Sequence, residues 1–349
     1  MVTCLTIGDP HFKINNSRDT ERMEQALLAV VTQHRPTFIV VMGDVLDRFE
    51  AIHVSPLTRA TKFLYQLSLH ARLFLLIGNH DRPNNSVFLT EQHPFNALKH
   101  WPNCTVVDTT TAMTIRGRLF VFVPYVYPGR LFEALERTPE WPKADAIFAH
   151  QELRGARLGV QTSAVGDVWA PDYPLIISGH IHDYHELQPN AVYVGTPLQH
   201  GYGDSADKTV SLFTFPGPED KVALEHRCLS LGLPRKRIMH MTAAELMQLS
   251  LDDGEGLKII VTGNEAEIRT AARSLQAKQL QEAGAKVVYR ETSQLQLTAE
   301  KPTVPYALAL YHNIERDTEL LGLYRELIGE LPAPRVTLRL NIKPATQTP

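Results

Sequence analysis

The sequence predicts a protein of the α/β class, on three observations. Short apolar runs rich in β-branched and aromatic residues alternate with longer segments that have the periodicity of amphipathic helices. Five of the apolar runs lead into a motif of carboxylate, amide or imidazole side chains. With 349 residues, 44% of them hydrophobic, the chain is also long enough to bury a sizeable core.

The five polar motifs follow apolar runs that we interpret as buried strands, at residues 5–7, 37–42, 73–77, 146–149 and 174–178. In order, the motifs are Asp9-Pro10-His11, Gly43-Asp44-Val45-Leu46-Asp47, Gly78-Asn79-His80-Asp81, His150 and Gly179-His180-Ile181-His182. Open α/β folds place their sites beyond the carboxyl ends of the strands, so we expect these side chains to converge at one sheet edge.

Segments with helical periodicity separate the strands. One helix is expected from Ser17 or Asp19 to about residue 34, and a second over residues 55–69 with Pro56 in its first turn. Further elements are expected at 88–98 and 131–137 (helices) and at 119–123, 192–194 and 209–215 (strands).

The ligand types of the motifs indicate a metal centre. Carboxylate, imidazole and one amide oxygen, without thiolate, suit Mn²⁺, Fe²⁺ or Zn²⁺ better than a structural Zn²⁺ site or Ca²⁺. The candidate ligands are too many for one ion and fit two ions that share a carboxylate: Asp9, His11, Asp44, Asn79, His150, His180 and His182. Two ions about 3.5–4 Å apart can clamp the attacking and leaving oxygens of a phosphoryl group.

The motif series resembles the calcineurin-like metallophosphoesterase superfamily, which reads D-x-H, G-D-x-x-D, G-N-H-[DE], H and G-H-x-H. The resemblance implies a sandwich of two packed sheets flanked by helices. It implies one metal ion held by Asp9, His11, Asp44 and His182. It implies a second ion held by Asp44, Asn79, His150 and His180, with Asp44 as the bridge.

The same resemblance assigns the catalytic roles. His80 matches the family's catalytic imidazole and Asp81 the carboxylate that orients it, although a carboxylate here could equally cap a helix. Asp47 is expected beside the ligands and not among them. The two ions would supply a bridging hydroxide that attacks phosphorus in line, while His80 gives a proton or a hydrogen bond to the leaving group.

Substrate-binding residues are harder to predict. Arg154 and Arg157 follow His150 closely, and His200 lies in a glycine-rich loop after the last motif, so we take these three as candidates to face the substrate. Each could instead belong to a solvated or packed surface. The net charge of −3 gives no global basic field that would attract nucleic acid.

We expect three parts along the chain: residues 1–228, 235–300 and 303–349. The first carries the metal motifs. The second is expected to be a small β-α-β unit, with strands at 258–261 and 286–289 around a helix at 265–282. In the third, a helical run at 306–331 carries an apolar stripe that could pack on the chain's own core or on another chain, and a strand-like stretch follows at 335–340.

A small β-α-β unit after the phosphoesterase domain resembles the SbcD-type DNA-repair nucleases, as does the stretch at residues 193–199. Asp47 stands where archaeal and eukaryotic members have histidine, which favours the bacterial and phage branch. The resemblance implies a Mn²⁺-dependent DNA exonuclease and endonuclease. It also implies an SbcC-type coiled-coil ATPase partner, bound through the C-terminal helical region, and a homodimer formed through residues 55–100.

Two other functions stay open on the sequence alone. The metal centre would serve equally in a general metallophosphoesterase acting on a nucleotide, a cyclic nucleotide or a phosphoprotein. A metal-free scaffold would need a degraded ligand set, whereas the expected ligands are all present.

The sequence also predicts a cytoplasmic protein that does not enter a membrane. No apolar run approaches the roughly 18 residues of a membrane span. The three cysteines (Cys4, Cys104 and Cys228) form no CxxC pair and read as free thiols of a reducing compartment.

Overall fold

The computed structural model describes residues 1–48, 51–159, 161–217, 223–250 and 254–292, together with residues 311, 314 and 317–328. Its contacts divide the chain into a first unit, Met1–Thr292, and a second unit, Ser293–Pro349. The strand expected at 335–340 lies outside the described residues. Within the described residues, no helix combines the length and the apolar character that a bilayer crossing requires.

The first sheet of the first unit has six strands in the order β14-β13-β1-β2-β3-β4. Strands β1 to β4 are parallel, and β13 and β14 extend the sheet with antiparallel pairings. In chain order the strands are β1 (Val2–Ile7), β2 (Phe38–Val41), β3 (Arg72–Leu76), β4 (Cys104–Val107), β13 (Thr209–Phe215) and β14 (Glu225–Ser230).

The second sheet also has six strands, in the order β11-β12-β10-β7-β6-β5. The four central strands are parallel and the two edge strands, β5 and β11, are antiparallel. In chain order the strands are β5 (Thr111–Ile115), β6 (Arg118–Val123), β7 (Ala146–Ala149), β10 (Ile176–Ser178), β11 (His185–Gln188) and β12 (Ala191–Tyr193).

The two sheets pack face to face through an aromatic core. Phe74 of the first sheet stacks on Phe122 of the second with ring centroids 4.0 Å apart, and Phe38 meets Phe148 edge-on at 5.8 Å. All four side chains are fully buried. Aromatic pairs of this kind stabilise a core by about 0.5–1.5 kcal/mol beyond their area. The two-sheet sandwich implied by the family resemblance is therefore confirmed.

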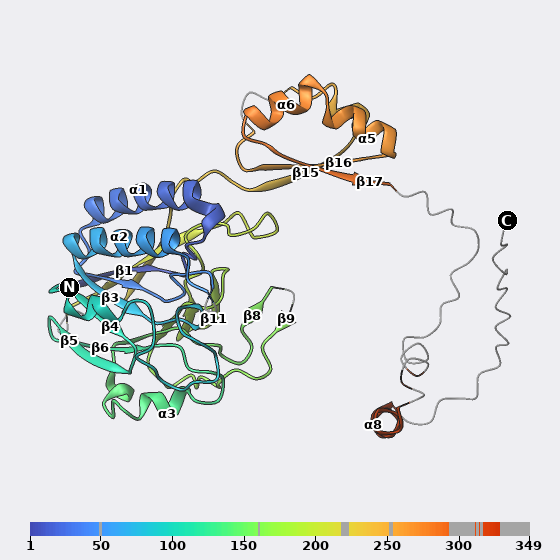
Figure 1. Ribbon diagram of the computed structural model, residues 1–349. Coiled ribbons are helices and arrows are strands. Elements are labelled where there is room, and N and C mark those ends of the chain that lie inside the picture. Colours follow the sequence, from blue (N-terminus) through green and yellow to red (C-terminus); the bar gives the residue numbers. More distant parts are fainter. Residues whose placement is uncertain are drawn as a thin grey trace. The chain divides into compact units, whose positions relative to one another are not determined.

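Helices cover the outer faces of the sheets. Helices α1 (Ser17–His34) and α2 (Val54–His70) lie side by side over the first sheet (Figure 1), and their apolar faces share one core with it. Helix α3 (Leu131–Leu135) packs its apolar residues into the core of the second sheet. These three elements, and the strands expected at 119–123, 192–194 and 209–215, agree with the sequence prediction to within a few residues.

The prediction of a helix over residues 88–98 is wrong. Only Asn96–His100 is helical there, as a short 3₁₀ helix (η3), and the preceding residues form turns and bends. Pro94 explains the difference, because it has no amide hydrogen to donate and its ring clashes with the preceding helical turn. Other 3₁₀ turns lie at η1 (Ile14–Asn16), η2 (Asn79–Asp81) and η4 (Trp141–Lys143). A two-stranded hairpin joins β8 (Arg157–Leu158) to β9 (Gln161–Thr162).

A third sheet of three parallel strands forms the C-terminal part of the first unit and has its own hydrophobic core. Its elements are β15 (Arg237–Thr242), α4 (Ala243–Leu246), β16 (Leu257–Gly263), α5 (Glu265–Ala272), α6 (Leu275–Glu282) and β17 (Lys286–Glu291). The sequence analysis expected the last two strands but missed β15 and α4. The single helix expected at 265–282 is two helices, because the hydroxyl of Ser274 accepts a hydrogen bond from the Ala277 amide and starts a new helix there.

In the second unit the structure describes helix α8 (Thr318–Ile328), inside the helical run expected at 306–331. Tyr324 is buried, whereas Leu320 and Leu323 are about half exposed. The apolar stripe expected from the sequence is thus only partly covered in the described part of this unit.

Candidate metal centre

The five polar motifs lie together because the strands before them are neighbours. Strands β1, β2 and β3 are adjacent in the first sheet, and β7 and β10 are adjacent in the second. Each is parallel to its neighbour, so the loops that follow them leave the same edge of the sandwich. The convergence that the sequence predicted is present.

One group of ligand atoms comes from Asp9, His11 and Asp44, and these atoms lie within 4.8 Å of one another. Nε2 of His11 is 3.8 Å from Oδ2 of Asp44 and 3.2 Å from Nε2 of His182. The other carboxylate, Asp9, accepts a hydrogen bond from the backbone amide of His180 at 2.9 Å. Of the four residues expected to hold the first ion, Asp9, His11 and Asp44 therefore lie together, and His182 adjoins them through His11.

A second group comes from Asp44, His150 and His180, again with ligand atoms within 4.8 Å of one another. Oδ1 of Asn79 lies 3.0 Å from both Nε2 of His150 and Nδ1 of His180. Nε2 of His150 is also 3.4 Å from Oδ2 of Asp44. Asp44 belongs to both groups, which is the position that a bridging ligand must occupy.

A backbone carbonyl holds one ring of this second group, and a carboxylate lies near the other. Nδ1 of His150 donates to the carbonyl oxygen of Met42 at 2.7 Å, which points Nε2 toward Asp44 and Asn79. Nε2 of His180 lies 4.0 Å from a carboxylate oxygen of Glu152. Partners on the far ring nitrogen are usual for histidines that bind metals, because they set the ring's orientation and tautomer. The sequence analysis did not identify Glu152 as part of this site.

Unusual backbone geometry is concentrated at the centre. Among the described residues, five that are not glycine have a positive φ angle, and three of these are the candidate ligands His11, Asp44 and His180. Such conformations cost about 1–3 kcal/mol each and persist where the surroundings enforce them. Gly78 shows how tight the packing is, because a Cβ atom there would lie 2.2 Å from Oδ1 of Asp44.

The buried charges indicate a place for cations. Oδ1 of Asp9 is buried, and within the part of the chain that the structure describes no donor forms a hydrogen bond to it. Burial raises the pKa of Asp9 to about 7, against the opposing effect of His150. Burial also raises the pKa of Asp44, but His150 and the other imidazoles outweigh it and hold that pKa well below its usual range. A buried carboxylate oxygen without a donor fits a divalent cation.

The imidazole of His150 carries a proton. Those of His180, His11 and His182 are neutral. Burial opposes protonation of His150, but Asp44 and Asp9 raise its pKa to about 9. Burial and neighbouring histidines lower the pKa of His180 to about 3, and burial also lowers the pKa of His11 and His182. Metal ions bind neutral imidazole, so most of the ring nitrogens are already in the form that ligates.

The partners of His80 and Asp81 differ from those that the family resemblance implies, and Asp81 caps the 3₁₀ turn η2 through the Gly78 amide, the alternative that the sequence left open. Nδ1 of His80 donates to the backbone carbonyl of Asp47 at 2.7 Å, and the His80 amide donates to Oδ1 of Asp44 at 2.8 Å. The carboxylate of Asp81 instead accepts hydrogen bonds from backbone amides, those of Val45, Leu46 and Gly78. The Asp47 carbonyl therefore orients the His80 ring, and Asp81 braces the two loops that carry Asp44 and Asn79.

Asp47 lies beside the ligands, as the sequence analysis expected. Its Oδ1 accepts a hydrogen bond from Nζ of Lys13 at 3.1 Å and is 3.8 Å from Nδ1 of His11. The negative charge of Asp47 thus compensates the positive charge of Lys13 at the edge of the centre.

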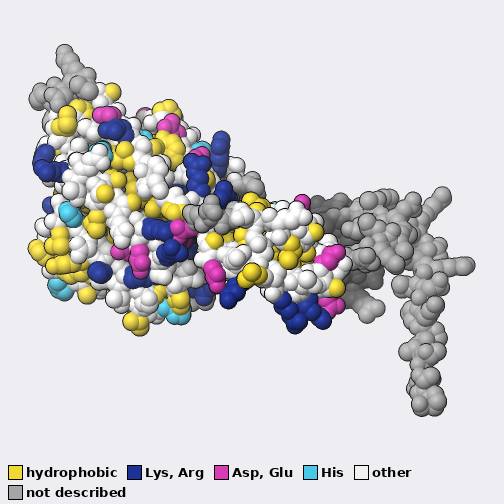
Figure 2. All heavy atoms as spheres, turned by 90° about the horizontal axis from the view of Figure 1, so that it is seen from above, with side chains coloured by type: hydrophobic (Ala, Val, Ile, Leu, Met, Phe, Trp, Pro, Cys, Tyr) yellow, Lys and Arg dark blue, Asp and Glu magenta, His cyan; other side chains and the backbone are white. Residues whose placement is uncertain are grey.

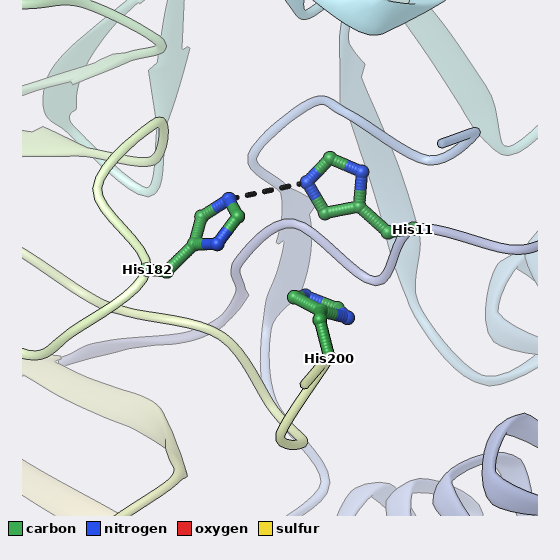
Figure 3. Close-up of side chains that lie close together, drawn as sticks. All are labelled: His11, His182 and His200. Atoms are coloured by element: carbon green, nitrogen blue, oxygen red, sulfur yellow. Dashed lines mark hydrogen bonds between the residues drawn. The ribbon is translucent and has the colours of Figure 1, made fainter. Parts of the chain in front are cut away.

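The three candidate substrate residues lie in different places. Arg157 lines a cavity of about 380 Å³ together with His180, His182 and Lys208. Arg154 is exposed, and its backbone amide donates to the Asp167 carbonyl. His200 is within the centre itself, against His11 and His182 (Figure 3).

The two-sheet sandwich and the paired ligand groups that share Asp44 define the class of metal-dependent phosphoesterases. Residues 2–184 match the calcineurin-like phosphoesterase family. The chain is 37% identical over 296 residues to "Putative phosphoesterase 078R" of Invertebrate iridescent virus 3, covering 83% of this chain and 84% of the relative. It is also 37% identical over 265 residues to "Putative phosphoesterase 244L" of Invertebrate iridescent virus 6, covering 74% of this chain and 93% of that relative.

The chain therefore belongs to the calcineurin-like phosphoesterase family, whose members are hydrolases that use two divalent metal ions. All seven candidate ligands fall inside the matched residues, and His200 falls outside them.

Proposed function

We propose that this protein is a DNA phosphodiesterase of the SbcD type, an exonuclease and endonuclease that depends on two divalent ions, with Mn²⁺ as the expected metal. The single observation that carries the proposal is the parallel β15–β17 unit, with its own core, joined to a phosphoesterase domain whose candidate ligands converge. A small unit of this kind after the phosphoesterase domain is one of the features that resemble the SbcD-type nucleases, together with the stretch at residues 193–199.

The residues of the centre have distinct roles in this proposal. Asp44 is shared by both ligand groups and would hold the two ions side by side, where they would polarise the phosphate and activate water. His80 would give a proton to the leaving oxygen, because its ring is held by Asp47 at the rim of the centre. Asn79 would supply the neutral oxygen ligand, fixed between His150 and His180.

DNA would be held through a few local phosphate contacts. Arg157 is exposed and lines the cavity next to His180 and His182, so it is the arginine we assign to a backbone phosphate. Lys208 lines the same cavity, but its ammonium group donates to the His182 carbonyl and to Asp183, which gives it a supporting role. On the face shown in Figure 2, lysine and arginine side chains occur singly or in small groups among acidic and apolar ones. Basic side chains on that face are therefore dispersed.

The partners belong to the same proposal. The half-exposed Leu320 and Leu323 on α8 support a C-terminal helix that binds an SbcC-type coiled-coil ATPase through its apolar stripe. Exposed apolar side chains on α2, Tyr65 and Leu69, support a homodimer formed through this part of the chain.

The test compares three substrates with Mn²⁺ and the purified full chain: end-labelled linear duplex DNA, a small phosphodiester and a phosphopeptide. We expect the DNA to be degraded, and degraded faster when a coiled-coil ATPase partner is added. Asp44→Ala, purified in parallel, should remove the activity and so exclude a contaminating nuclease.

A different result would favour the general phosphoesterase. Turnover of the small ester or the phosphopeptide while DNA remains intact, with and without the ATPase, would contradict the nuclease proposal. Equal activity of wild type and Asp44→Ala would contradict the assignment of the centre itself.

A further inference from the structure

His200 lies in the metal centre although it belongs to none of the five motifs. The residue follows β12 in a loop outside the matched residues 2–184. Its ring centroid is 4.7 Å from that of His11 and 5.2 Å from that of His182. Figure 3 shows the three imidazoles gathered around one space, with the His11–His182 nitrogen contact drawn between two of them.

The hydrogen bond of His200 fixes which nitrogen carries the hydrogen. Nε2 lies 3.0 Å from the backbone carbonyl oxygen of Asp9. A carbonyl oxygen only accepts, so Nε2 must donate, and in the neutral ring Nδ1 then carries a lone pair. Nδ1 is buried, and no group of the described residues donates a hydrogen bond to it. A buried acceptor without a donor is costly unless another group satisfies it.

This arrangement is the one that ligating histidines adopt. A metal-binding imidazole usually donates its far N–H to a carbonyl or carboxylate, and so directs the lone pair of the other nitrogen to the ion. His150 has the same arrangement in this centre, with Nδ1 on the Met42 carbonyl. In His200 the roles of the two nitrogens are reversed: Nε2 donates to the backbone carbonyl, and Nδ1 carries the free lone pair.

The loop holds His200 in this place. Oδ2 of Asp204 accepts hydrogen bonds from the backbone amides of His200 and Gly201 at 2.7 and 2.9 Å. The backbone beside the ring is thus fixed by a neighbouring carboxylate and does not depend on the imidazole. One ligand atom from each of His11, His182 and His200 lies within 4.8 Å of the others.

We propose that His200, through Nδ1, is an additional ligand of the metal ion held by His11 and His182. The inference rests on the two-ion centre of the proposed function. It gives that ion three imidazole ligands beside Asp9 and Asp44. Imidazole favours Fe²⁺, Co²⁺ and Zn²⁺ over Mn²⁺ more strongly than carboxylate does, so His200 would shift the preference of this position toward the later metals.

The test uses metal binding to the full chain after the resident metal has been removed with a chelator. His200→Gln keeps an amide that can donate to the Asp9 carbonyl but has no acceptor at the Nδ1 position. His200→Asn places an oxygen close to that position. Calorimetric titration with Co²⁺ and with Mn²⁺ gives the affinities, and the visible absorption of Co²⁺ reports the coordination number.

We expect wild type to bind two ions and His200→Gln to bind one of them at least about tenfold more weakly, with stronger visible Co²⁺ bands from the lost ligand. The loss should be larger for Co²⁺ than for Mn²⁺. His200→Asn should retain most of the affinity. His226→Gln, whose ring stacks on Phe213, is the matched control and should bind as wild type does.

Two results would overturn the inference. One is an unchanged affinity and Co²⁺ spectrum in His200→Gln. The other is a weaker metal affinity in His200→Ala together with wild-type affinity in His200→Gln, because the ring would then act only by holding the Asp9 backbone. If wild type itself fails to bind two ions, the proposed function fails instead, so the two failures are distinguishable.

Discussion

Nε2 of His150 lies 3.4 Å from Oδ2 of Asp44, and both side chains are buried. Without metal, the imidazolium of His150 compensates the charge of the aspartate, which is why the pKa of His150 rises to about 9 in spite of burial. A metal ion binding to the same two side chains must displace that proton. The metal-free protein thus holds a proton where the ions are expected.

The first prediction is that metal uptake releases protons in a pH-dependent way. The pKa of His150 is raised to about 9 and that of Asp9 to about 7, so both carry protons at pH 6.5, mainly His150 does at pH 8, and neither does at pH 10. Beyond the proton given up by the water that the ions activate, we expect the proton release from His150 and Asp9 on adding Mn²⁺ to be largest at pH 6.5, smaller at pH 8 and close to zero at pH 10. A pH indicator in weakly buffered solution measures it, and release independent of pH would contradict the assignment.

The same pKa shift predicts how the metal-free protein responds to alkali. The pKa of His150 in the folded state lies above its ordinary value, so its contribution to stability is complete below about pH 6.5 and is lost as the pH rises through about 9. We expect the free energy of unfolding of the metal-free protein to fall between these values. His150→Gln should remove this part of the slope, which denaturant unfolding at several pH values would measure.

Gly78→Ala tests the packing of the centre. The added methyl group would lie 2.2 Å from Oδ1 and 2.3 Å from the backbone nitrogen of Asp44, so the Asp44 loop must shift. We expect a loss of about 1–3 kcal/mol in the free energy of unfolding and weaker binding of both ions. Gly322→Ala is the control, because no atom of the described residues lies within 4 Å of its added methyl group. Wild-type metal affinity in Gly78→Ala would show that the loop is less constrained than the structure indicates.

His80→Gln separates proton donation from metal binding. If His80 protonates the leaving oxygen, the variant should lose about 10²–10⁴-fold in kcat on DNA while binding both ions normally. The loss should be much smaller on a nitrophenyl phosphodiester, whose leaving group needs no proton. Equal losses on both substrates would assign His80 to positioning and not to proton transfer.

Arg157→Ala tests the proposed phosphate contact. Removing one phosphate contact should weaken DNA binding and lower the slope of log K against log salt by about one unit. Arg269→Ala is the control, because that exposed arginine pairs with Glu265 on α5, among the β15–β17 elements. A salt slope that stays the same in Arg157→Ala would exclude the contact.

The sequence predicted those features that depend on local order along the chain. Apolar runs that end in a polar motif mark parallel strands, and parallel neighbours bring their carboxyl ends together, so the place of Asp44 and His150 followed from pattern alone. Helices α1 and α2 followed from periodicity and from start signals, Ser17 or Asp19 for the first and Pro56 for the second. The new helix that starts at Ser274 and the loss of helix before Pro94 are local features as well. The pattern of apolar residues does not reveal either of them.

Features that depend on tertiary contacts could not be predicted in the same way. The His200 ring reaches the centre because its loop folds back onto the Asp9 carbonyl, and no spacing along the chain encodes that contact. Spacing along the chain does not encode the bridging role of Asp81 either, because its carboxylate accepts hydrogen bonds from backbone amides of two separate loops. Glu152 beside His180 is a third case.

Anomalous diffraction from crystals soaked with Mn²⁺ shows whether two metal ions share Asp44. We expect two peaks about 3.5–4 Å apart, on either side of the Asp44 carboxylate. A single peak, or two peaks of which one lies away from Asp44, would contradict the account.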